Sequence, residues 1–248
     1  MEVSIMGGGY INTLRGNKCF SRNELFEAII KTGQSISEAS FKLQLQRLLK
    51  QRQILRVGRN AYVVNIGKRQ EYDYDYSDLA NNVAEKIKEK HSFLFFTIFE
   101  SIQLNEFVNH QIAHNTVYVS VSEGLGSFVF ETLKAEYQGK VLVNPSIDVF
   151  HQYWVDDMIV IEDLITEAPK AKEKPWMSKP EKYLVDLMAD PLLLESISVS
   201  EYPAIYEETF IRYVVDESQM FRYAKRRNAY AKVKQFIKER TNVELRTE

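Results

Sequence analysis

Residues 21–33 read SRNELFEAIIKTG, and this stretch opens the segment that decides the fold of the first part of the chain. Its apolar residues recur with the period of a helix, which places them on one face. Ser21 precedes the pattern as an N-cap, Glu24 completes a capping box three residues later, and Thr32-Gly33 ends the helix. We therefore expect a short amphipathic helix with an apolar face made of Leu25, Phe26, Ile29 and Ile30.

Residues 37–50 read SEASFKLQLQRLLK and predict a second helix. Ser37 can cap it, and Glu38 suits its positively polarised start. Two short helices joined by a tight link are typical of a helix–turn–helix, in which the second helix presents polar side chains outward. The predicted apolar stripe is Phe41, Leu45, Leu48 and Leu49, and the outward residues are Lys42, Gln44, Gln46, Arg47 and Lys50.

A β-hairpin is expected directly after the second helix. The runs QILRV (53–57) and AYVV (61–64) are β-prone, and the turn Gly58-Arg59-Asn60 separates them. A hairpin in this position is the wing of a winged helix–turn–helix, with Arg56 and Arg59 at or near its tip. We place this fold over residues 1–70.

The charge of the chain is unevenly distributed, although its total is only −2. Residues 1–70 contain twelve Lys or Arg against four Asp or Glu, a net charge of +8. Residues 71–211 contain ten against twenty-five, a net −15, and residues 212–248 contain ten against five, a net +5. A basic winged helix joined to an acidic remainder is typical of a DNA-binding module attached to a domain with another task.

The residue types of the winged helix suit DNA. Gln, Arg and Lys can address base edges in the major groove, and Arg and Lys neutralise phosphates. The alternative is a winged helix that contacts only protein. The residues that we expect to contact DNA are Lys42, Gln44, Gln46, Arg47, Lys50, Arg56, Arg59 and Tyr62.

Residues 71–78, beginning with Glu71-Tyr72-Asp73-Tyr74-Asp75-Tyr76, are expected to form an exposed linker. The rest, residues 79–248, is predicted to be a mixed α/β domain with a helical C-terminal part, so the whole chain is α+β or mixed. Apolar strand-like runs at 116–121, 140–143 and 158–161, with a helix over 128–137, indicate a mixed sheet flanked by helices. A helix opening near Pro180 should end at Asp190-Pro191.

The last third is expected to be helical, over residues 207–215 and 220–240. The second of these helices has a basic face opposite its apolar stripe. That face is either a solvated surface or a patch for nucleic acid or an acidic partner. Its main basic residues are Arg222, Lys225, Arg226, Arg227, Lys232 and Lys234.

The lack of a targeting signal and the single cysteine predict a cytoplasmic protein. No basic-then-apolar leader begins the sequence, and the longest apolar run, residues 93–99, is far shorter than the roughly 20 residues of a membrane span. Cys19 is the only cysteine, so no internal disulfide can form. We expect no membrane association.

No catalytic constellation emerges from the sequence. His110 and His114 lack the intervening Glu of a zinc-protease motif, and GLGS at residues 124–127 lacks the Lys of a P-loop. Asp73 and Asp75 have D-x-D spacing but no preceding Gly-Ser turn. We expect no enzyme activity, no cofactor and no metal. The alternative is a Mg²⁺-dependent nuclease or nucleotidyltransferase using the acids around the last strand, Asp156, Asp157, Glu162 and Asp163, with Lys170 nearby.

Two segments resemble the AbiE-type antitoxins of bacterial abortive-infection, or type IV toxin–antitoxin, systems. The wing Arg56-Val57-Gly58-Arg59-Asn60-Ala61-Tyr62 is similar to their R-x-G-R-G-x-Y pattern, with Asn60 in place of a glycine. The segment 178–187, SKPEKYLVDL, is similar to their S-x-E-[RK]-T-L-V-D-L, with one extra residue before Glu181 and with Tyr183 in place of a small residue.

The resemblance implies a function for both parts of the chain. Such antitoxins repress their own operon through the winged helix and counter a nucleotidyltransferase toxin through the C-terminal domain, often without a stable complex. We therefore expect a DNA-binding transcriptional repressor with antitoxin activity, whose partners are operator DNA and such a toxin. A protein-interaction adaptor is a further alternative.

Overall fold

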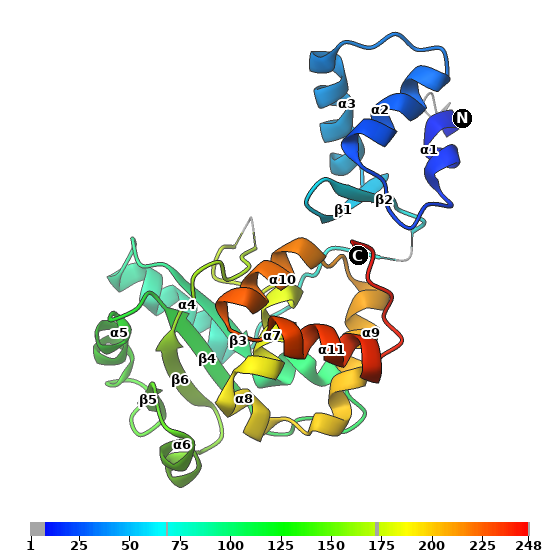
Figure 1. The fold of residues 1–248 in the computed structure, drawn as a ribbon. Coiled ribbons are helices and arrows are strands. Elements are labelled where there is room, and N and C mark those ends of the chain that lie inside the picture. The colour runs from blue at the N-terminus through cyan, green and yellow to red at the C-terminus, as the bar shows by residue number, and fades with distance from the viewer. Residues whose placement is uncertain (1–7, 68, 172–173, 248) are drawn as a thin grey trace, which may run out of the picture. The chain divides into compact units, whose positions relative to one another are not determined.

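The computed structural model describes residues 8–67, 69–171 and 174–247. Its internal contacts divide the chain into two units (Figure 1). The first unit, here called the head, contains the described residues within 1–71, 210–219 and 244–248. The second, the body, contains the described residues within 72–209 and 220–243. The sequence predicts residues 210–219 and 244–248 as part of the C-terminal domain, whereas in the structure residues 210–219 and 244–247 pack with the head.

The head is a winged helix–turn–helix. Helix α2 (Arg22–Lys31) begins at Ser21, which forms the predicted capping box with Glu24, and its C-cap is Thr32. Helix α3 (Glu38–Lys50) begins at Ser37, whose hydroxyl accepts a hydrogen bond from the Ser40 N–H. The predicted apolar faces meet in one core, which includes Leu25, Ile29, Phe41, Leu45 and Leu48, but Ile30, predicted on this face, is 47% exposed.

The predicted wing is present as strands β1 (Ile54–Gly58) and β2 (Ala61–Val64), which pair antiparallel. Arg59 and Asn60 form its two-residue turn. Asn60 has a φ of 55°, which is the left-handed conformation that Asn adopts more readily than most residues. Phe20 pairs with Tyr62 across β2, so a third short extended segment joins the hairpin to the helices.

A further helix, α1 (Gly8–Leu14), precedes the two predicted ones. Its sequence, GGYINTL, starts with two glycines and contains poor helix formers, so local propensity does not predict it. Tyr10, Ile11 and Leu14 are nevertheless buried in the core of the head and pack beside α2. Tertiary burial therefore stabilises this helix.

The body contains a four-stranded mixed sheet, in the order β3-β4-β6-β5. Strand β3 (Phe96–Glu100) is antiparallel to β4 (Thr116–Val121), and β6 (Met158–Asp163) is parallel to both β4 and β5 (Val141–Val143). The predicted strands are confirmed. Strands β4 and β5, which are consecutive in the chain, are not neighbours in the sheet, because β6 lies between them.

Side chains alternate between the two faces of this sheet, as the pleat requires. On one face, Val117, Val119 and Ile161 pack in a core with α4 (Asp78–Lys90) and α5 (Gly126–Leu133). On the other face, Phe99 and Tyr118 lie 6.1 Å apart between ring centroids, and Phe99 lies 6.1 Å from Tyr183 of helix α7 (Pro180–Ala189). A short 3₁₀ helix, η1 (Ser101–Glu106), follows β3.

Residues 72–76 differ from the predicted exposed linker. Asp73 and Asp75 are exposed, but the tyrosines that alternate with them are half-buried (Tyr72 and Tyr74) or buried (Tyr76). The rings of Tyr72, Tyr74 and Tyr76 contact one another in succession, and the Tyr76 hydroxyl donates to the Ile98 carbonyl at 2.8 Å. The alternation of Tyr and Asp therefore reflects an extended segment whose tyrosines pack on the body and whose aspartates face outward.

The remaining helices complete the body and supply part of the head. They are α6 (Ile147–Tyr153), α8 (Pro191–Ser196), η2 (Val199–Glu201), α9 (Tyr202–Arg212), α10 (Glu217–Arg226) and α11 (Tyr230–Arg240). The single helix predicted over 220–240 is wrong, because a turn at residues 227–229, with Asn228 at a φ of 52°, separates α10 from α11. In the described parts of the chain, no helix combines the length and apolar character needed to cross a membrane.

Candidate nucleic-acid interface

The outer face of α3 carries an exposed basic and polar surface. Lys42, Gln46, Arg47 and Lys50 are all exposed, as the sequence predicts. They lie outside the buried stripe of Phe41, Leu45 and Leu48, with Gln46 and Lys50 on the side opposite it. The helix is anchored by its apolar face, so these four side chains project from a rigid support.

Two further predicted DNA contacts have packing roles in the structure. The Gln44 side-chain amide donates to the Tyr10 hydroxyl at 2.7 Å, which joins α3 to α1. Tyr62 is only 8% exposed and its ring stacks on Phe20 at 6.2 Å. Tyr62 is therefore buried and not on the outer surface, and Gln44 is half-buried beside the core of the head.

The wing presents the two predicted arginines. Arg56 is exposed, and its Nε donates to the Gly58 carbonyl at 3.1 Å, which holds the guanidinium beside the turn. Arg59 is exposed at the tip. Asn60 links the wing to the helices, because its side-chain oxygen accepts a hydrogen bond from the Arg22 N–H at 3.0 Å. The left-handed turn is therefore also tied to the start of α2.

Two distant segments of the chain hold the wing, and the sequence gives no signal for them. The Arg59 N–H donates to the Ser218 hydroxyl at 2.9 Å. A Cβ on Gly58 would lie 2.6 Å from Cγ2 of Thr247 and 2.8 Å from the Ser218 hydroxyl oxygen. Only glycine therefore permits this close approach without a shift of both neighbours.

Glu217 fastens these two segments to each other. It is 1% exposed, and its carboxylate accepts hydrogen bonds from the N–H groups of Arg246 and Thr247, at 2.9 and 2.8 Å, and from the Thr247 hydroxyl at 2.8 Å. The Cys19 thiol donates to the Arg246 carbonyl at 3.2 Å. The segments 210–219 and 244–247 thus form one support for the wing, here called the wing clamp.

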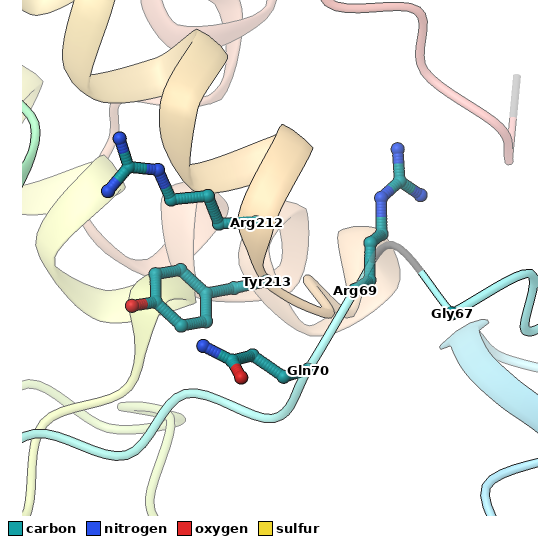
Figure 2. Close-up of a pocket in the computed structure, with 5 residues that line it drawn as sticks. All are labelled: Gly67, Arg69, Gln70, Arg212 and Tyr213. Atoms are coloured by element: carbon teal, nitrogen blue, oxygen red, sulfur yellow. The ribbon is translucent and has the colours of Figure 1, made fainter.

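An open hollow of about 330 Å³ also lies in the head, lined by Gly67, Arg69, Gln70, Arg212 and Tyr213. The Gln70 N–H donates to the Arg212 carbonyl at 2.9 Å, so two separate segments meet there. Burial lowers the pKa of Arg69 to about 10. Figure 2 shows that the two guanidinium groups point away from each other, so they do not converge on one bound group.

Four residues of the predicted basic patch on the C-terminal helices, Arg222, Lys225, Arg226 and Lys232, are exposed, and several patch residues also contact neighbouring groups of the body. Arg222 pairs with Glu167 at 2.9 Å, and the Lys232 ammonium donates to the Met188 carbonyl at 2.7 Å. The ammonium groups of Lys225 and Lys234 lie over the Tyr230 ring, at 4.9 and 6.0 Å from its centroid. Arg226 is exposed.

Arg227 does not belong to this surface, which corrects the prediction. Its side chain is only 15% exposed and pairs with Asp186 at 3.2 Å and with Asp190 at 3.0 Å. The Tyr223 hydroxyl donates to Asp186 at 2.8 Å, and Lys182 pairs with the same carboxylate at 2.7 Å. Helix α7 is buried along almost its whole length, so these charges form an internal network.

Glu162, at the end of β6, adjoins this network. It accepts a hydrogen bond from the Ser120 hydroxyl at 2.8 Å. Burial is the main cause that raises the pKa of Glu162 to about 7, and the nearby Asp190 carboxylate adds to it. The carboxyl group therefore titrates near neutral pH.

The acidic residues of the alternative Mg²⁺-dependent enzyme do not form one cluster. Asp156 and Asp157 precede β6, whereas Glu162 and Asp163 end it. Asp156 accepts from the Asn115 N–H, and Asp163 accepts from the Asn144 amide. Among the described residues, no group of three His, Cys, Asp or Glu side chains is arranged to hold a metal ion.

The comparisons with known proteins add a family. No curated protein matches the sequence significantly. One solved structure that is similar is the crystal structure of RV2827C protein from Mycobacterium tuberculosis, at 8% identity, 96% coverage of this chain, 82% coverage of that chain and a TM-score of 0.26. At this TM-score the similarity bears on neither fold nor function. Residues 40–243 match DUF6577, a family of unknown function, and because the match spans most of the sequence the chain belongs to this family.

Proposed function

We propose that this protein binds duplex DNA through its head and acts as a transcriptional repressor. The observation that carries the proposal is the outer face of α3, where Lys42, Gln46, Arg47 and Lys50 are exposed on the second helix of a helix–turn–helix. In this fold the second helix enters the major groove. Arg and Lys there can bond guanine edges, and Gln can bond adenine.

The wing supplies the second part of the interface. Arg56 and Arg59 are exposed at or beside its turn, and the wing clamp limits the movement of that turn. We assign these arginines to the DNA backbone or the adjacent minor groove, where they position the protein. Helix α3 then discriminates between sequences.

We further propose an antitoxin role for the chain, directed at a nucleotidyltransferase toxin. Its support is the resemblance of the wing and of residues 178–187 to AbiE-type antitoxins. The wing departs from their pattern at Asn60, and the φ of 55° there is compatible with the glycine that those antitoxins have. The second segment corresponds to the buried helix α7, so its resemblance reflects packing of the body.

The test of DNA binding is a salt titration with a duplex from the region upstream of the gene, compared with a scrambled duplex. We expect Arg47→Ala to weaken specific binding by about 1–3 kcal/mol, roughly 5- to 150-fold, because it removes a base contact. Arg59→Ala should weaken both duplexes alike and lower the salt slope by about 0.9.

Lys90→Ala is the matched control, because Lys90 is an exposed lysine of α4 in the body. It should bind as the unaltered protein does. Equal affinity for both duplexes in the unaltered protein, or no effect of either arginine variant, would reject the assignment. Co-expression with an adjacent nucleotidyltransferase tests the antitoxin role, which requires that the full chain restore growth.

A further inference from the structure

The outer face of α3 also includes an apolar side chain. A helix turns by about 100° per residue, so the direction opposite Phe41, Leu45 and Leu48 passes through positions 39, 43, 46 and 50. All four are exposed in the structure: Ala39, Leu43, Gln46 and Lys50. Leu43 is 57% exposed and lies close to the centre of this outer face.

Contacts on the other sides of α3 fix its rotation. The Gln44 amide binds the Tyr10 hydroxyl on one flank, and Glu38 pairs with Arg22 of α2 near the start. The Arg22 guanidinium also lies over the Phe41 ring, 5.3 Å from its centroid. Leu43 therefore projects outward because of how the helix is held.

An isolated exposed leucine is common on protein surfaces and needs no explanation. The position of Leu43 is different, because Lys42, Gln46 and Arg47 surround it on the face that would enter the major groove. The base edges there are polar with one exception, the C5-methyl group of thymine. A leucine in the middle of this face has that methyl group as its natural apolar partner.

We propose that Leu43 makes this protein selective for DNA sites with thymine at a defined position, by packing against the thymine methyl group, with Ala39 beside it one turn earlier. This inference rests on the proposed function. The flanking Lys42 and Arg47 hold phosphates or guanine edges, and Leu43 adds discrimination without adding charge.

The test removes only the methyl group. A preferred duplex is selected from a random pool with the full chain, and each thymine in turn is replaced by deoxyuridine. We expect about a three- to five-fold loss of affinity at one or two positions, the size of one methyl-sized apolar contact. Leu43→Ala should bind thymine and deoxyuridine duplexes equally at those positions, with an unchanged salt slope.

Two further variants separate a specific role from a general one. Leu43→Met keeps an apolar side chain and should retain the preference for thymine. Ile30→Ala removes another exposed apolar side chain of the head, 47% exposed on α2, and should leave the preference intact. A thymine preference that persists in Leu43→Ala, or that is absent at every position in the unaltered protein, overturns this inference alone. Failure to select any duplex overturns the DNA-binding proposal with it.

Discussion

Helix α3 of the head and the pair α10–α11 of the body look alike in the sequence, since each combines an apolar stripe with several Lys and Arg residues. The structure separates them. On α3 the basic side chains are exposed on the face away from the core. On α10 and α11, Arg222, Lys225, Arg226 and Lys232 are exposed as well. There, however, Arg222 pairs with Glu167, Lys225 lies over Tyr230, Lys232 binds the Met188 carbonyl, and Arg227 is largely buried. The two regions therefore differ in how far their basic side chains are engaged by other groups of the fold.

The largest expected effect comes from Arg227→Ala. This change leaves Asp186 and Asp190 buried without their guanidinium partner, and removing one member of a buried ion pair typically destabilises a protein by about 3–5 kcal/mol. The measurement is the free energy of unfolding in urea. Arg226→Ala, at the exposed neighbouring position, should change it by no more than about 0.5 kcal/mol. Similar values for the two variants would show that Arg227 is an ordinary surface residue.

The next largest effect is the pH dependence that Glu162 gives to the free energy of unfolding. The pKa of Glu162 is raised from 4.5 to about 7 in the folded protein, so folding favours the protonated carboxyl. Below about pH 4.5 the group is neutral in both states. As the pH rises towards 7, the unfolded chain releases the proton first, and the contribution of Glu162 to the free energy of unfolding falls by up to about 3 kcal/mol.

Glu162→Gln removes this titration. The free energy of unfolding of the variant, relative to that of the unaltered protein, should therefore rise between about pH 4.5 and 7 and stay constant above that range. Urea titrations at several pH values measure it, with the exposed Glu131→Gln as a control. A difference that does not vary with pH would contradict the raised pKa.

A smaller effect is expected from the wing clamp. Glu217→Gln replaces a carboxylate with an amide whose nitrogen cannot accept the hydrogen bonds of Arg246 and Thr247. We expect a loss of about 1–3 kcal/mol in the stability of the clamp. Hydrogen exchange should become faster at the N–H groups of Thr247 and Arg59. Unchanged protection of both would show that Glu217 does not hold the wing.

The smallest effect on stability is expected on α3 itself. Lys42→Ala removes an exposed charge, so the free energy of unfolding should change by no more than about 0.5 kcal/mol. Its effect should appear in DNA binding, where losing one phosphate contact lowers the salt slope by about 0.9. If Lys42→Ala destabilised the head as much as Arg227→Ala destabilises the body, the contrast between the two basic regions would fail.

The sequence alone determined the elements whose signals are local. The caps at Ser21 and Ser37, the helical periods of α2 and α3, and the turn at Asn60 all depend on residues that are at most four positions apart. Strands β4, β5 and β6 of the body follow from their short apolar runs in the same way. Helical periodicity also places Leu43 outward, although the predicted outward residues did not include it.

Only the tertiary structure decided the features that join distant residues. Helix α1 forms because Tyr10, Ile11 and Leu14 are buried, and its own propensity does not predict it. Arg227 is largely buried because it pairs with Asp186 of α7 and with Asp190, which follows that helix, 41 and 37 positions earlier in the sequence. The wing clamp joins Arg59 to Ser218, across 159 positions of sequence. Such contacts depend on how helices and strands pack together. A charged residue in the sequence can be exposed or can pair inside the fold, so the pattern of neighbouring residues does not decide between the two.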